Sequence, residues 1–152
     1  MANTCLNFAS VYGESDNLRL FNLEVDNKWE TNWYDLGENV SDYQFESRWV
    51  APVDYIKELS LKFSVLIECE SEEIGCDYYC KFSYKNGELI YKIELPYLEG
   101  KYASMEWNEY VNSVVMSELD DPDPFDEFME RFSFLSDEHR IELEELFFEH
   151  SN

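Results

Sequence analysis

The sequence predicts an α+β fold in which an antiparallel sheet with helices is followed by helices alone. Three observations predict it. Strand and helix patterns alternate over residues 4–95, an Asn-Gly pair joins two alternating segments, and apolar residues beyond Pro96 recur at helical spacing. The chain has 152 residues, of which 45% are hydrophobic and 17% aromatic, which suffices for one core and an appendage. We therefore expect an α+β domain over residues 1–100 and an acidic helical extension over residues 101–152 that packs on it.

The first segments predict a strand, a short helix and an irregular stretch. Residues 4–12 contain spaced apolar side chains and precede Gly13, which is typical of a strand. The apolar residues of this strand are Cys5, Phe8 and Val11. Ser15 can cap the helix that follows. The apolar residues of that helix are Leu18, Phe21 and Val25. Residues 28–39, with Trp29 and Trp33 among polar residues, are expected to be irregular and held by these aromatics.

The middle of the chain predicts a strand, a helix and three more strands. Apolar and polar residues alternate over 43–49, and Pro52 suits the first position of a helix because its missing N–H costs nothing there. Apolar residues at helical spacing follow at Val53, Ile56, Leu59 and Phe63. The three expected strands cover residues 64–70, 77–84 and 89–95. Asn86-Gly87 predicts a hairpin between the last two, because both residues tolerate positive φ.

The C-terminal third predicts helices. Residues 105–116 carry apolar side chains at helical spacing, and the two prolines within residues 120–124 must interrupt the helix. Residues 125–132 again show helical spacing. Ser136 is a good N-cap for a last helix that runs to about Glu149.

Three segments of the sequence are distinctive: MANTCLNFASVYG, KWETNWYDL and FESRWVAPVDYIKELSLKF. They resemble segments of the YubB-type ferredoxin-like domain of plasmid and phage proteins. The opening MANTCLNFASVYG is similar to that of the family, although Thr4 stands where the family has tryptophan. The matching residues of the opening are Met1, Ala2, Asn3, Cys5, Asn7, Val11 and Gly13. KWETNWYDL is similar to the family's tryptophan-rich loop, and FESRWVAPVDYIKELSLKF resembles its strand-helix element. The resemblance covers about residues 1–95 and leaves a divergent acidic helical C-terminal extension uncovered. It implies a ferredoxin-like antiparallel sheet with helices on one face, and a mobile-element setting in which small acidic proteins often oppose host defences.

The charge restricts the class of partner. Asp and Glu number 34 against 11 Lys and Arg, which gives a formal charge of -23. Such a field repels nucleic acid and anionic membrane and favours a basic protein surface, although it could also serve solubility alone. The sequence has neither a membrane-length apolar run nor a signal-peptide pattern, so we expect a cytoplasmic protein, in the host cytoplasm if a phage encodes it.

Catalytic and metal signals are weak. The four cysteines, Cys5, Cys69, Cys76 and Cys80, are expected to be reduced thiols. Three of them could join His139 or His150 at a zinc ion, but the spacing lacks the two-residue knuckle of structural zinc sites. Both histidines lie in the last expected helix, and no nucleophilic triad is readable. We expect no enzyme activity, metal or cofactor. The alternative is a metal-binding or enzymatic accessory protein that uses the Cys and Glu residues of 68–80.

The acidic C-terminal region is the candidate binding surface. Residues 117–152 hold 13 acids against Arg131 and Arg140. At 100° per residue, four glutamates of the last helix form one stripe, while Leu143, Leu146 and Phe147 lie on a face suited to the core. The candidate partner-binding residues are Asp120, Asp121, Asp123, Asp126, Glu127, Glu130, Glu138, Ile141, Glu142, Glu145, Phe148 and Glu149.

Two apolar residues flank the glutamate stripe. Ile141 and Phe148 would stay exposed unless a second layer, a dimer mate or a partner covers them, or unless they pack on the preceding helix through Phe128 and Phe132. Carboxylates one helical turn apart lie roughly 5–6 Å from each other, a spacing of the same order as that of phosphates. The sequence therefore predicts an anti-CRISPR or anti-restriction inhibitor that mimics nucleic acid and binds a basic host protein. A self-associating structural protein or homodimer is the further alternative.

Overall fold

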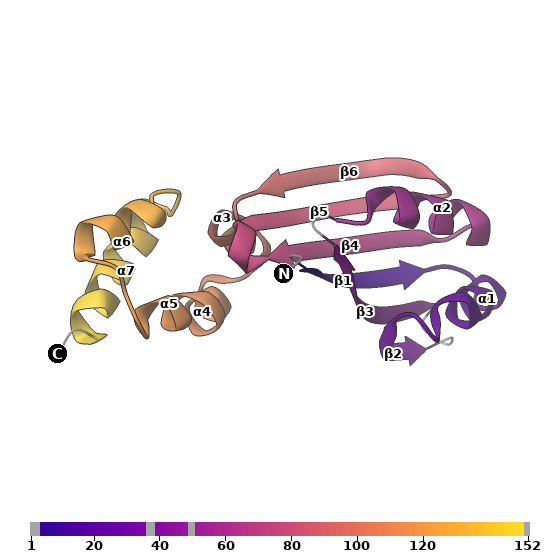
Figure 1. Cartoon of the computed structure of the whole chain (residues 1–152), viewed down its shortest axis with the longest axis horizontal. Coiled ribbons are helices and arrows are strands. Elements are labelled where there is room, and N and C mark those ends of the chain that lie inside the picture. Colours follow the sequence, from indigo (N-terminus) through magenta and orange to yellow (C-terminus); the bar gives the residue numbers. More distant parts are fainter. Residues whose placement is uncertain (1–3, 36–38, 49–50, 151–152) are drawn as a thin grey trace. The chain divides into compact units, whose positions relative to one another are not determined.

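The chain divides into two compact units, Met1–Leu95 and Pro96–Asn152. The computed structural model describes residues 4–35, 39–48 and 51–150 (Figure 1). The sequence predicted the boundary after residue 100. The division comes earlier because Pro96, which cannot donate to a strand ladder, follows the last strand directly. That the helical extension packs on the sheet domain stays a prediction.

The first unit is a six-stranded antiparallel sheet with the strand order β2-β3-β1-β4-β5-β6 (Figure 1). The strands are β1 (Thr4–Tyr12), β2 (Glu30–Asp35), β3 (Val40–Arg48), β4 (Leu66–Glu73), β5 (Tyr78–Lys85) and β6 (Glu88–Leu95). The helices are α1 (Ser15–Val25), α2 (Val53–Phe63) and the short 3-10 helix η1 (Ile74–Cys76). From β1 to β4 the order is β-α-β-β-α-β, the ferredoxin-like arrangement, and β5 and β6 extend the sheet beyond β4. The predicted fold class is confirmed.

One face of the sheet packs against α1 and α2 and forms the core of the first unit. Alternate residues of β1 are buried on this face, because side chains of a strand alternate between its two sides. These residues are Cys5, Asn7, Ala9 and Val11. The helices contribute Leu18, Phe21, Val25, Ile56 and Leu59 to the same core. Phe8, grouped with the apolar residues of this strand in the sequence, lies on the opposite face because the period is two.

Both helix starts lie one residue from the prediction. α1 begins at Ser15 itself, with Glu14 in the N-cap position and no side-chain capping hydrogen bond. Pro52 occupies the N-cap of α2 rather than its first position. These shifts leave the buried residues of both helices as predicted.

The expectation of an irregular segment over residues 28–39 is wrong for residues 30–35, where β2 pairs with β3, and residues 36–38 lie outside the described part of the chain. The sequence of β2 is polar and shows no alternation. β2 is an outer strand, so its conformation is fixed by backbone hydrogen bonds to β3. This pairing has a register shift after Thr31. Trp29 is held as predicted. It is 5% exposed, and its ring stacks on Phe45 at a centroid distance of 4.1 Å.

The predicted hairpin between β5 and β6 is present. Asn86 has φ 51° and Gly87 has φ 80°, the combination that a two-residue turn of type I′ requires. Gly87 N–H donates to the buried Ser60 Oγ at 2.9 Å, and a Cβ at Gly87 would lie 3.1 Å from Leu61 Cβ. The turn is therefore fixed both by its own backbone and by its contact with α2.

The second unit is helical, as predicted. Its helices are α3 (Tyr97–Ser104), α4 (Trp107–Tyr110), the π-helical segment η2 (Val111–Val115), α5 (Met116–Leu119), α6 (Phe125–Arg131) and α7 (Asp137–His150). α3 was not predicted from the sequence. Residues 105–116 were predicted as one α-helix, whereas the π-helical segment lies inside them. The predicted interruption over residues 120–124 and the Ser136 cap are confirmed, and His139 N–H donates to Ser136 Oγ at 3.3 Å.

The core of the second unit is rich in aromatic side chains. Its fully buried residues include Tyr110, Phe128, Phe132 and Leu143. Phe128 packs on Phe132 and on Phe147 with centroid distances of 5.1 Å in both cases. Tyr110 O–H donates to the Leu98 carbonyl at 2.9 Å, so the one polar atom of this ring is satisfied. The face of α7 predicted to be buried is indeed the buried one.

Candidate functional site

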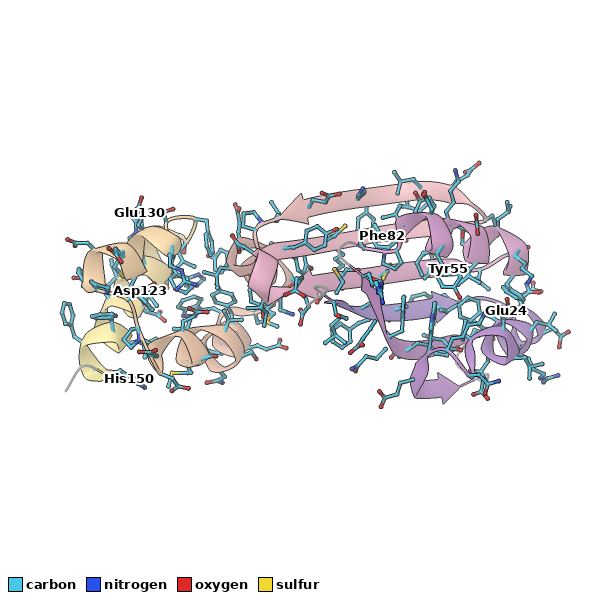
Figure 2. The ribbon with its side chains drawn as sticks, in the orientation of Figure 1. Glu24, Tyr55, Phe82, Asp123, Glu130 and His150 are labelled. Carbon is cyan, nitrogen blue, oxygen red and sulfur yellow. The ribbon has the colours of Figure 1, made fainter. Side chains whose placement is uncertain are left out.

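The predicted binding residues of the second unit lie largely on its surface. They come from the segment after α5, from α6 and from α7 (Figure 2). The exposed carboxylates are Asp120, Asp121, Asp126, Glu127, Glu130, Glu138, Glu142, Glu145 and Glu149. Asp123 is half-buried. The helices therefore bring most of the predicted acids to solvent, where a partner could reach them.

Asp123 is occupied by an internal ion pair. Its Oδ2 accepts a hydrogen bond from Arg131 at 3.1 Å, and the same guanidinium nitrogen lies 2.8 Å from Glu118. Arg131 thus binds two carboxylates across the proline-containing break between α5 and α6. This pairing holds the break in place and removes Asp123 from the set of free acidic groups.

Glu142 also has an internal partner. Its Oε2 accepts a hydrogen bond from Trp107 Nε1 at 2.5 Å. One turn earlier on α7, His139 stacks on the same indole with a centroid distance of 4.1 Å and an angle of 5° between the planes. Tyr102 O–H lies 2.8 Å from His139 Nδ1. α7 is therefore attached to α3 and α4 by a cluster of Tyr102, Trp107, His139 and Glu142.

This cluster was not predicted from the sequence, although the spacing of two of its members indicates part of it. His139 and Glu142 are three residues apart on a predicted helix and so share a side of it. Their partners, Tyr102 and Trp107, lie more than 30 residues away in sequence, and no local pattern pairs them. The cluster makes Glu142 a residue that positions α7 rather than a free member of the acidic stripe.

The apolar pair beside the stripe is exposed, which is one of the alternatives that the sequence left open. Ile141 is 61% exposed and Phe148 is 50% exposed. Phe148 nevertheless stacks on Phe125 of α6 at a centroid distance of 5.0 Å. The packing on the preceding helix that the sequence left open therefore occurs, but it involves Phe125 rather than Phe128 or Phe132.

A second acidic surface lies on the face of the sheet opposite α1 and α2. The strand register places Glu68, Glu70 and Glu72 of β4 on this face, beside Phe8 and Ser10 of β1. A hollow of about 220 Å³ lies there, lined by Phe8, Ser10, Glu68, Cys69, Glu70 and Lys81. The row of Glu68, Glu70 and Glu72 was not predicted from the sequence, although glutamates at every second residue of a strand necessarily share a face.

The negative field of this face has a measurable consequence for a neighbouring phenol. The pKa of Tyr91 is raised above its ordinary value, first by burial and then by the carboxylates of Glu68 and Glu70. Opposing charge comes from Lys81, which is paired in register with Glu70. The open face of the sheet is thus acidic with interspersed aromatic rings.

The chain matches a family model described as the ferredoxin-like domain in Api92-like protein, over residues 28–116. The match covers more than half of the chain and includes β2 to β6 as well as α3, α4 and η2. The chain belongs to this family. Membership agrees with the β-α-β-β-α-β order described above, and it extends beyond the segment over which the sequence resembled YubB-type proteins. The chain matches no curated protein and no solved structure.

Three of the four cysteines of this ferredoxin-like family member are buried thiols, and the side chain of Cys76 lies outside the part of the chain that the structure describes. Cys5, Cys69 and Cys80 are buried on the helix-bearing face of the sheet. Burial raises the pKa of Cys69 to about 12, and burial also raises the pKa of Cys80. Because the thiolate is the nucleophilic form, neither group is activated for catalysis at neutral pH. Within residues 4–35, 39–48 and 51–150, no three His, Cys, Asp or Glu side chains are placed to hold a metal ion together.

Polar groups buried in the sheet have a structural explanation. Asn7 is fully buried, donates to Ser47 Oγ at 2.9 Å and accepts from Ser71 Oγ at 2.5 Å. These bonds join β3, β1 and β4 on the helix-bearing face. They satisfy Asn7 without leaving it free for chemistry. Across the described part of the chain, no helix has both the length and the apolar character needed to cross a bilayer.

Proposed function

We propose that this protein is a non-catalytic inhibitor that binds a basic, nucleic-acid-handling protein of a host cell through its acidic helical unit. The observation that carries the proposal is the exposure of eleven carboxylates along α6, α7 and the segment before them. Residues 117–152 offer only Arg131 and Arg140 as counter-charges, and Arg131 already binds Glu118 and Asp123. The remaining charge is uncompensated, and it favours a cationic partner.

The spacing of the free glutamates supports nucleic-acid mimicry. Glu138, Glu145 and Glu149 are exposed on one side of α7. Glu145 and Glu149 are one helical turn apart, and carboxylates at that separation lie about 5–6 Å from each other, which is of the same order as the phosphate spacing of a nucleic-acid strand. Glu138 lies two turns before Glu145. The cluster around Trp107 and His139 fixes α7 in the unit, so these charges are held in place before a partner binds.

The biological setting is the second part of the proposal. The resemblance of residues 1–95 to YubB-type proteins of plasmids and phages favours a product of a mobile element that acts in the host cytoplasm. A CRISPR effector or a restriction enzyme is the class of target that combines a basic nucleic-acid groove with a role in host defence. The inhibitor would occupy that groove in place of DNA or RNA.

Competition with DNA tests the proposal. The full chain is titrated into purified CRISPR effectors and restriction enzymes, each bound to a labelled DNA duplex, at low and at high salt. We expect displacement of DNA from at least one enzyme, with loss of inhibition as salt rises, because screening weakens charge pairing across the interface. If the protein displaces DNA from none of these enzymes, the proposal is contradicted.

A matched pair of variants separates the acidic stripe from net charge. Glu138→Gln, Glu145→Gln and Glu149→Gln together remove three exposed carboxylates from α7. Asp26→Asn, Asp54→Asn and Glu58→Gln remove three exposed carboxylates from the sheet unit and serve as the control. The α7 variant should inhibit about tenfold more weakly than wild type, with a change of less than about twofold for the control. Equal losses would show that only net charge matters.

A further inference from the structure

The outer strand β6 has a free edge and an exposed apolar surface. It ends the strand order, so no further described strand pairs with its outer edge (Figure 1). Such an edge presents backbone N–H and C=O groups that can pair with another strand. Three large apolar residues of β6 are about half exposed: Leu89 at 52%, Ile90 at 56% and Ile93 at 49%. This combination is typical of an edge that accepts another strand.

The second half of β6 is a regular ladder. The shift in the pairing with β5 lies between Ser83 and Tyr84, so residues 91–95 of β6 are unaffected by it. Tyr91, Ile93 and Leu95 share the face opposite the helices. Lys92 and Glu94 share the helix-bearing face and form an exposed ion pair of 2.8 Å. The edge therefore carries apolar groups on one side and two opposite charges on the other.

This pattern is complementary to itself under a two-fold axis. If a second β6 pairs antiparallel about an axis through Ile93, each Lys92 lies opposite Glu94 of the second copy. Ile93 lies opposite its own equivalent, and Tyr91 lies opposite Leu95 of the second copy. Opposite charges and apolar pairs directly across two strands are both stabilising. All five positions of the ladder are thus matched.

The neighbouring registers are worse matched. The axis must pass through a residue, because paired residues share a face of the sheet. An axis through Lys92 places two lysines opposite each other. An axis through Glu94 places two glutamates opposite each other. An axis through Tyr91 places Glu88 opposite Glu94 and Ile90 opposite Lys92. An axis through Ile90 would set Glu88 opposite Lys92, but it passes through the shift in the ladder and would pair Leu89 with Tyr91, which lie on different faces of the sheet. Within the regular ladder, only the register centred on Ile93 pairs charge with countercharge.

We propose that the protein forms a two-fold dimer by antiparallel pairing of β6 with β6 of a second copy, which continues the sheet through both chains. The two faces of the sheet are preserved across such an axis, so the helices of both copies cover the same side. The interface is of the isologous kind that is commonest in homodimers. The inference rests on β6 and is independent of the acidic helical unit.

Salt distinguishes this dimer from inhibitor binding. Each copy carries a formal charge of -23, so the two copies repel at long range, and added salt screens this repulsion. Dimerisation of the full chain, measured by sedimentation equilibrium, should strengthen from low to moderate salt, whereas binding to a basic protein should weaken. A monomer at every salt and protein concentration overturns the dimer without affecting the proposed inhibition.

Charge reversal tests the register. Lys92→Glu places glutamate opposite Glu94 of the second copy, and Glu94→Lys places lysine opposite Lys92. Each change should weaken the dimer about tenfold, because two attractive cross-strand pairs become repulsive. The double variant restores the pairs in reverse and should recover dimerisation. Glu94→Lys is the more informative single change. It makes the net charge of each copy less negative, which by itself would favour association, so a weaker dimer must come from the repulsion between the paired lysines. A dimer that tolerates both single variants overturns the proposed interface.

A disulfide across the axis provides a geometric test. Ile93→Cys places two thiols directly opposite each other, within the Cβ separation of about 4.5–5.5 Å typical of cross-strand pairs. Mild oxidation should then yield a covalent dimer. Ile90→Cys, on an equally exposed residue of the same strand, does not face its equivalent in this register and should give no more covalent dimer than wild type. Equal cross-linking of both variants overturns the register.

Discussion

The sheet unit and the helical unit carry similar numbers of acids but differ in how these are balanced. Met1–Leu95 has eighteen Asp and Glu against eight Lys and Arg, whereas Pro96–Asn152 has sixteen against three. Each unit has its own core, of strands and two helices in one case and of short helices in the other. The comparison shows that negative charge per residue is concentrated in the unit without a sheet, which supports assigning the basic partner to that unit.

The largest expected effect tests whether the two cores are independent. Phe82→Ala in the sheet unit and Phe128→Ala in the helical unit each remove a fully buried ring. Each should destabilise its own unit by about 3–5 kcal/mol, because transfer free energy is lost and a cavity remains. Native-state hydrogen exchange, read separately over β1 and α7, measures the two units in one experiment. If either variant lowers protection equally in both, the units unfold together and the comparison fails.

A glycine substitution sharpens the comparison within the sheet unit. Gly87→Ala must hold a side chain at φ 80° and 3.1 Å from Leu61 Cβ. The expected loss of stability is about 1–3 kcal/mol, confined to the sheet unit, because strain at positive φ adds to a close contact. Gly75→Ala is the control, since its Cβ would meet only the flexible Glu73 carboxylate and its φ is not positive. Denaturant unfolding of both variants measures the difference, and equal losses would contradict this account.

The smallest expected effect is a pH dependence that arises in the sheet unit. Burial raises the pKa of Cys69 to about 12, so the folded state favours the neutral thiol. The stabilising contribution is complete below the unfolded pKa of 9.0 and is lost as the pH rises toward the folded value. By pH 10 the loss should be about 1 kcal/mol. Unfolding followed at pH 8 and pH 10 measures it, and Cys69→Ala should reduce the slope. An unchanged slope in that variant would assign the effect to other groups.

Much of the fold was predictable because its signals are local. Asn86-Gly87 predicted the hairpin since both residues must accept positive φ, and Ser136 predicted the start of α7 through its side-chain oxygen. β2 was missed because an outer strand with polar residues has no alternation and is defined by its partner β3. The π turn over Val111–Val115 was missed because apolar spacing there fits an α-helix equally well.

The candidate surface divides in the same way. Exposure of Glu145 and Glu149 follows from the angle between residues on one helix, which the sequence determines. The internal partners of Asp123 and Glu142 could not be predicted, since Arg131 and Trp107 reach them across breaks between helices. The acidic row on β4 could have been predicted from the spacing of its glutamates. Its exposure could not, because that depends on which face of the strand packs on helices.

The sequence by itself determined the α+β class, the hairpin, the interruption before α6 and the acidic character of the helical unit. These depend on φ preferences, side-chain periodicity and charge, which are properties of residues close together in the chain. Only the tertiary structure decided the strand order, the attachment of α7 by Tyr102, Trp107 and His139, and the free edge of β6. These depend on contacts between residues distant in sequence, whose pairing is fixed by packing of the whole unit.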